Sequence, residues 1–62
     1  MKFKVGNIVT RDGSDEHIVI EVEEDDFDII VVKCVKEPVE QWIKLGEEER
    51  NLASRYDLVR EE

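Results

Sequence analysis

Alternation of apolar and polar residues is the dominant pattern along this chain, and it predicts short β-strands. The pattern is clearest over residues 17–23. In that segment one face carries Ile18, Ile20 and Val22, and the other carries His17, Val19, Glu21 and Glu23. We expect the three aliphatic residues of the first face to point into the core and His17 to lie on the surface.

Residues 28–36 give the strongest strand signal because they are rich in β-branched side chains. One side of this strand carries Ile30, Val32 and Cys34, and we expect Cys34 to be a small buried side chain. The other side carries Ile29, Val31 and Val35. Both faces of this strand are therefore apolar. Val19 and Trp42, on the neighbouring predicted strands, add to the second face, which is either covered by the rest of the chain or open to a partner.

Turn residues set the limits of the other elements. A first strand is predicted over residues 5–11, followed by a loop over 12–16 in which Asp12–Gly13 is a strong turn dipeptide. Pro38 ends the strand 28–36 because proline cannot donate to a strand ladder. Alternation resumes over residues 39–45 and predicts a fourth strand.

The tail admits two interpretations. Helical spacing of Leu45, Leu52, Tyr56 and Val59 predicts a short helix over residues 47–55. The alternative, which we prefer, is a strand near 50–53, a single turn near 54–57 and a last strand over 58–60. With that tail, residues 1–62 form one mostly β domain, a small SH3-like barrel of about five short antiparallel strands with a 3₁₀ or short helical turn near the C-terminus.

Composition sets the charge and excludes several kinds of site. The chain has 62 residues, a formal net charge of -8 and a single cysteine. A domain of this size buries only about 60% of its unfolded surface, which leaves little room for a substrate cavity.

One cysteine excludes an internal disulfide and a multi-cysteine zinc site, and it fits a cytoplasmic setting. No apolar run approaches the roughly 20 residues of a membrane span, and residues 1–7 lack the apolar core of a signal peptide.

The segment 21–28 concentrates acidic residues at a predicted hairpin tip. Its members are Glu21, Glu23, Glu24, Asp25, Asp26 and Asp28, with Phe27 among them. A calcium loop needs a glycine at its sharp turn and a terminal bidentate glutamate, and this segment has neither. We therefore predict no metal and no cofactor. The acids keep the neighbouring aliphatic run 29–32 soluble, and their surplus favours a basic protein partner.

The usual catalytic constellations are missing from the sequence. No base is predicted beside Cys34, and there is no glycine-rich phosphate loop. Paired carboxylates perform acid–base chemistry only in a cleft that separates their pKa values, and none can be inferred here. We predict that the protein is not an enzyme.

Both ends of the chain resemble small SH3-like proteins of the KOW and Tudor type. Residues 3–11, FKVGNIVTR, are similar to the opening of such barrels, and residues 54–61, SRYDLVRE, are similar to their closing turn and strand. The resemblance implies an SH3-like barrel that binds nucleic acid or peptide tails through loop aromatics and basic residues. The chain departs from that pattern because its loops are acidic and it has few aromatic side chains, which argues against an aromatic cage.

Charge and composition together predict a non-enzymatic acidic protein–protein interaction module, a monomer or weak dimer. It would dock on the basic surface of a nucleic-acid-binding protein as a DNA mimic, and phage-encoded inhibitors of host enzymes are often short, acidic and single-domain in this way. The predicted partner-binding residues are Glu21, Glu23, Glu24, Asp25, Asp26, Phe27, Asp28 and Trp42. We expect no direct nucleic acid binding, because the net charge repels phosphate. The alternative is a KOW-like module of a ribonucleoprotein or transcription complex, with contacts from Lys2, Lys4, Arg11, Lys33, Lys36 and Lys44.

Overall fold

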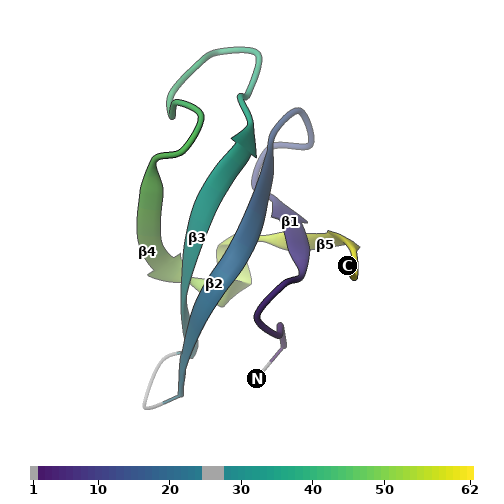
Figure 1. Cartoon of the computed structure of the whole chain (residues 1–62), viewed down its shortest axis with the longest axis vertical. Coiled ribbons are helices and arrows are strands. Elements are labelled where there is room, and N and C mark those ends of the chain that lie inside the picture. The colour runs from purple at the N-terminus through teal and green to yellow at the C-terminus, as the bar shows by residue number, and fades with distance from the viewer. Residues whose placement is uncertain (1, 25–27) are drawn as a thin grey trace.

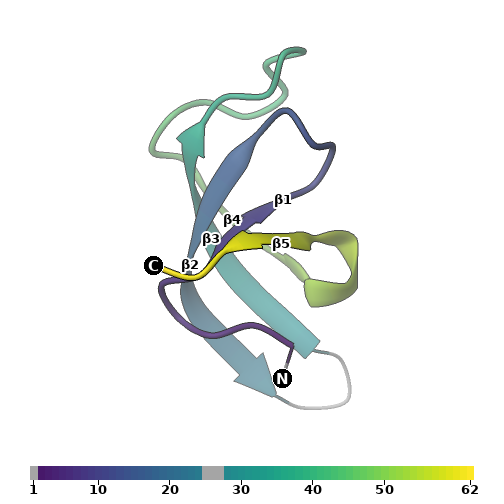
Figure 2. The same ribbon diagram turned by 90° about the vertical axis from the view of Figure 1, so that its right-hand side faces the viewer.

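The computed structural model describes residues 2–24 and 28–62, and these form one five-stranded antiparallel sheet in the order β4-β3-β2-β1-β5 (Figure 1). The strands are β1 (Ile8–Thr10), β2 (Glu16–Glu24), β3 (Asp28–Lys36), β4 (Glu48–Leu52) and β5 (Asp57–Arg60). A 3₁₀ turn, η1 (Ala53–Arg55), is the one helical element of the described residues. The short β5 runs at a steep angle to the long β2–β3 hairpin, so the sheet is strongly curved (Figure 2). The predicted mostly β class, with five short antiparallel strands and a turn near the C-terminus, is confirmed.

β3 matches its predicted limits, and its two faces divide as expected. Ile30, Val32 and Cys34 are buried, whereas Ile29 and Val31 are half-buried and Val35 is exposed. The predicted burial of Cys34 is therefore confirmed.

The predicted core face of β2 is wrong over its first half. Val19 is fully buried, whereas Ile20 is 38% exposed. The cause is a break in register: Val19 pairs with Val32, but Glu21 already pairs with Val31. One extra residue in the strand reverses the alternation beyond that point, so Val22 again packs against the core. His17, predicted to lie on the surface, is completely buried because it precedes the bulge and shares the face of Val19.

The predicted strand over residues 39–45 is also wrong. Residues 37–47 form a loop in which the Gln41 backbone N–H donates to the Pro38 carbonyl at 2.9 Å, and Gln41 has a left-handed φ of 54°. This turn directs Ile43 inward and leaves Val39 exposed, which strand alternation cannot do. The tail follows the preferred interpretation, with strand, turn and strand at β4, η1 and β5.

The core lies inside the curve of the sheet and beneath η1. Its members are Phe3, Val9, Val19, Ile30, Val32, Ala53 and Tyr56. The two ends of the β2–β3 hairpin are far apart, because Glu24 pairs with Asp28 at one end and Glu16 with Lys36 at the other. We call residues 21–28 the hairpin end. The opposite end, formed by the β1–β2 loop (11–15) and the β3–β4 loop (37–47), we call the loop end (Figure 1).

Candidate functional site

The hairpin end carries most of the predicted partner-binding residues. Glu21 and Asp28 are exposed on β2 and β3. Glu24 ends β2, and the predicted contacts Asp25, Asp26 and Phe27 lie outside the described residues. Glu23 is engaged within the chain: Arg50 of β4 donates from Nε to Glu23 Oε2 at 2.7 Å and from its NH2 group to Oε1 at 2.9 Å. The hydrogen bond from Arg50 lowers the pKa of Glu23.

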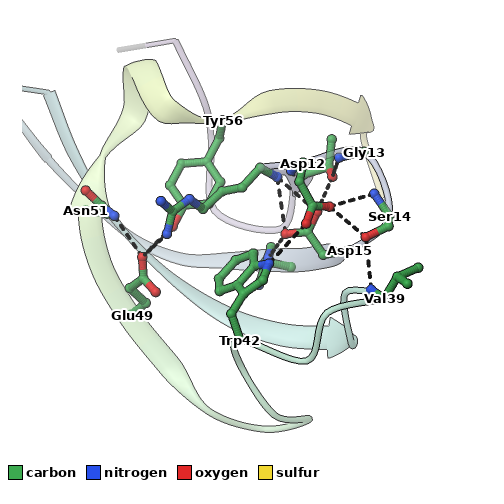
Figure 3. A network of polar contacts seen from close by, with 12 residues as sticks. Asp12, Gly13, Ser14, Asp15, Val39, Trp42, Glu49, Asn51 and Tyr56 are labelled. Atoms are coloured by element: carbon green, nitrogen blue, oxygen red, sulfur yellow. Dashed lines mark hydrogen bonds and ion pairs between the residues drawn. The ribbon is translucent and has the colours of Figure 1, made fainter.

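Trp42, the remaining predicted contact, lies at the loop end. The structure therefore does not bring the acidic segment and Trp42 together, since the full length of the β2–β3 hairpin separates them (Figure 1). Trp42 is instead surrounded by a polar cluster (Figure 3). Its members are Arg11, Asp12 and Asp15 of the β1–β2 loop, His17 of β2, Glu49 of β4, and Tyr56, which follows η1.

Asp15 closes the β1–β2 loop from inside the protein. It is 1% exposed, and its carboxylate accepts hydrogen bonds from the Thr10 hydroxyl and from the backbone N–H groups of Arg11 and Asp12. His17 Nε2 is also bonded to it. Burial by itself would raise the pKa of Asp15, but the hydrogen bonds from Thr10, His17 and the loop backbone outweigh it and hold that pKa well below its ordinary value.

His17 forms the floor of the cluster. Its side chain is fully buried, and its ring centroid lies 5.8 Å from that of Trp42 and 6.0 Å from that of Tyr56. Its Nδ1 has no hydrogen-bond partner in the described part of the chain. The bond to Asp15 orients the imidazole, and the Trp42 indole lies beside it at a tilt.

Trp42 is neither core nor free surface. Its indole Nε1 donates to Asp12 Oδ2 at 3.0 Å, and the Arg11 guanidinium lies 4.9 Å from the ring centroid. Even so, 40% of the residue remains exposed. Contacts with the β1–β2 loop and with His17 therefore set the orientation of an indole that still meets solvent.

Arg11 links this indole to Glu49 of β4 and to Tyr56. Its NH1 group donates to Glu49 Oε1 at 2.8 Å, and its guanidinium carbon lies 5.9 Å from the ring centroid of Tyr56 (Figure 3). Tyr56 is buried, and burial raises its pKa to about 12. Beside these groups lies a surface cavity of about 430 Å³, lined by Arg11, Asp12 and Trp42.

The buried and the exposed groups of this cluster differ in what they can contact. A buried His–Asp pair can serve as a catalytic base only if substrate reaches it, and both side chains have no exposed surface. Within residues 2–24 and 28–62, no three potential metal ligands gather. No helix of those residues is long and apolar enough to cross a membrane. The groups that line the cavity are an indole, a carboxylate and a guanidinium, and tryptophan and arginine are enriched in protein-binding hot spots.

Sequence reasoning identified Trp42 but missed the residues that hold it. Arg11, Asp12 and Asp15 lie in the β1–β2 loop, and His17 lies at the start of β2. From the sequence, Asp12–Gly13 was recognised only as a turn, His17 was placed on the surface and Arg11 was named only for the KOW-like alternative. A usable signal was present: an aspartate shortly after a turn can accept hydrogen bonds from the backbone of its own loop.

No protein-family model, no curated protein and no solved structure matches this chain.

Proposed function

We propose that this protein is a non-catalytic acidic module that binds a basic surface of another protein and contacts it through the loop end. The observation that carries the proposal is the state of Trp42, which is held by Asp12, Arg11 and His17 yet is 40% exposed beside a cavity. An aromatic side chain fixed in advance loses little conformational entropy when a partner covers it. Such residues dominate the binding free energy of many interfaces.

The net charge of -8 indicates the class of partner. It repels phosphate backbones and anionic membranes, and it attracts basic surfaces such as those of nucleic-acid-binding proteins. Exposed acids at the hairpin end, including Glu21 and Asp28, extend this field along the molecule. On this proposal they speed encounter, whereas the loop end makes the contact.

The KOW-like alternative has less support from the geometry. Two of the basic side chains on which it relies already have partners within the protein. Lys2 Nζ donates to the Tyr56 carbonyl at 2.9 Å, and Arg11 forms an ion pair with Glu49. The exposed lysines that remain are accompanied by an excess of acids. A phosphate backbone would need a continuous basic face.

Trp42 is the single tryptophan of the chain, so its fluorescence reports on the proposed site. Titration with a lysine homopeptide at about 50 mM salt should shift the emission saturably, and the affinity should fall steeply as salt is added. A glutamate homopeptide and duplex DNA should leave the emission unchanged. If the lysine peptide leaves the Trp42 emission unchanged, the proposal is wrong. If duplex DNA shifts the emission as much as the lysine peptide does, the KOW-like alternative is favoured.

A further inference from the structure

The β3–β4 loop holds a fixed shape without regular secondary structure. Besides the turn at Gln41, the Glu47 N–H donates to the Lys44 carbonyl at 3.1 Å. Cys34 of β3 is bonded at both its N–H and its carbonyl, to the Glu47 carbonyl and the Gly46 N–H, each at 2.9 Å. These bonds give the loop a defined backbone conformation, which sets the positions from which its outward side chains project.

This fixed loop exposes large apolar side chains. Pro38 and Ile43 are buried beneath it, whereas Val39 is 83% exposed, Leu45 is 61% exposed and Trp42 is 40% exposed. The backbone N–H of Val39 donates to Ser14 Oγ, Ser14 Oγ donates to Asp12 Oδ1, and Asp12 Oδ2 accepts from Trp42. Val39 and Trp42 thus meet the same turn of the β1–β2 loop (Figure 3). Both residues therefore lie beside this turn, and Trp42 lines the cavity together with Arg11 and Asp12.

Three carboxylates of the loop end accept hydrogen bonds from neutral donors. Asp12 accepts from the Trp42 indole and from Ser14. Glu37 Oε2 accepts from the Leu45 backbone N–H at 3.1 Å, and Glu47 Oε1 accepts from the Lys44 backbone N–H at 2.8 Å. None of the three forms an ion pair with a cation in the described ranges 2–24 and 28–62. These hydrogen bonds orient the three carboxylates without neutralising their charge.

We propose that the loop end binds a basic amphipathic segment of a partner protein, whose apolar side chains cover Val39 and Trp42 while its lysines or arginines meet Asp12, Glu37 and Glu47. This inference rests on the proposed function and adds the location and chemistry of the contact. Fixed carboxylates beside a fixed apolar surface complement a segment that presents both kinds of group. Each pairing would neutralise a carboxylate without breaking the neutral hydrogen bond that holds it.

A second copy of the chain fits this surface poorly. It would bring the same three carboxylates to the contact and a further net charge of -8. Like charges across an interface disfavour association. The occupant is therefore a partner of opposite charge.

The charge test exploits the neutral donors. Replacing Glu37→Gln and Glu47→Gln together removes two charges but leaves an oxygen to accept each hydrogen bond. Asp12 is kept, because both of its oxygens accept hydrogen bonds and asparagine offers only one. The control, Glu21→Gln and Asp28→Asn, removes two charges from exposed residues elsewhere. A labelled amphipathic leucine–lysine peptide is titrated with each variant by fluorescence anisotropy. The loop-end variant should weaken binding by about fivefold, from roughly 0.5 kcal/mol per exposed pair, and the control by about twofold or less.

The apolar test uses two exposed valines. Val39→Ser should weaken binding of the same peptide about fivefold, whereas Val5→Ser, at a valine that is 61% exposed in the N-terminal turn, should leave it unchanged. A scrambled leucine–lysine peptide of equal composition should bind more weakly than the amphipathic one.

Equal losses in the two charge variants, or equal binding of the scrambled peptide, would overturn this inference while leaving the proposed function standing. Failure of every basic peptide to bind the wild-type protein would overturn both.

Discussion

Replacing Asp15 with alanine should remove the acceptor that closes the β1–β2 loop. The carboxylate is 1% exposed and takes hydrogen bonds from Thr10, from the backbone of Arg11 and Asp12, and from His17. Hydrogen bonds to a charged group contribute about 1.5–3 kcal/mol each, and a buried donor left unpaired costs about 1–3 kcal/mol. The donors share one acceptor and some can reach water in the variant, so these contributions do not add fully.

We expect Asp15→Ala to lower the free energy of unfolding by about 3–5 kcal/mol, because it removes a charged acceptor and leaves several of its donors unpaired. The whole domain, at 62 residues, has roughly 3–9 kcal/mol of stability. The variant should therefore be at or near the limit of folding at room temperature. Urea denaturation followed by circular dichroism and by Trp42 emission measures the loss, with Asp57→Ala, at an exposed position of β5, as the control.

A loss below about 1 kcal/mol would refute this reasoning, because it would mean that the loop stays closed without its buried acceptor. A large loss in the Asp57→Ala control would point instead to a general sensitivity of this small core.

Three further predictions concern pH, register and thiol burial. The pKa values of Asp15 and Glu23 in the folded protein lie below their ordinary values, so the stability that these carboxylates contribute is present above about pH 5 and is lost as the pH falls toward about 2. The melting temperature should therefore drop over that interval. A melting temperature that stays constant would contradict the hydrogen bonds assigned to these two carboxylates. Val19→Ala should cost about 2 kcal/mol in urea denaturation and Ile20→Ala less than about 1 kcal/mol, whereas the reverse order would show that β2 lacks its bulge. Burial raises the pKa of the Cys34 thiol, so maleimide should label it only after unfolding, and rapid labelling of the native protein would place that side chain at the surface.

The sequence was sufficient to predict β3, because four β-branched residues follow one another over 29–32 and Pro38 marks the end of the strand. It was misleading for β2, where the alternation of Ile18, Ile20 and Val22 is regular but one bulged residue reverses the faces. Nothing local to that strand marks the bulge, since it depends on how β2 meets β3. Strand-like alternation over residues 39–45 was misleading for a related reason, since the turn at Gln41 and the bonds to Cys34 are tertiary features.

The same limit applies to the candidate site. Trp42 could be singled out because a large aromatic residue in a small acidic chain is conspicuous. The burial of His17 could not be foreseen, because it follows from the pairing of His17 with Val9 and Cys34 in neighbouring strands. Without that burial there is no reason to connect Asp15 with His17, or either of them with Trp42.

The most direct test of the docking site is a map of amide NMR shifts as a basic amphipathic peptide is added to the wild-type protein. Binding at the loop end predicts saturable shifts in residues 11–15 and 37–47 and in the Trp42 indole N–H, which donates to Asp12. Shifts confined to residues 21–28 would contradict this location and would place the contact on the acidic hairpin end instead.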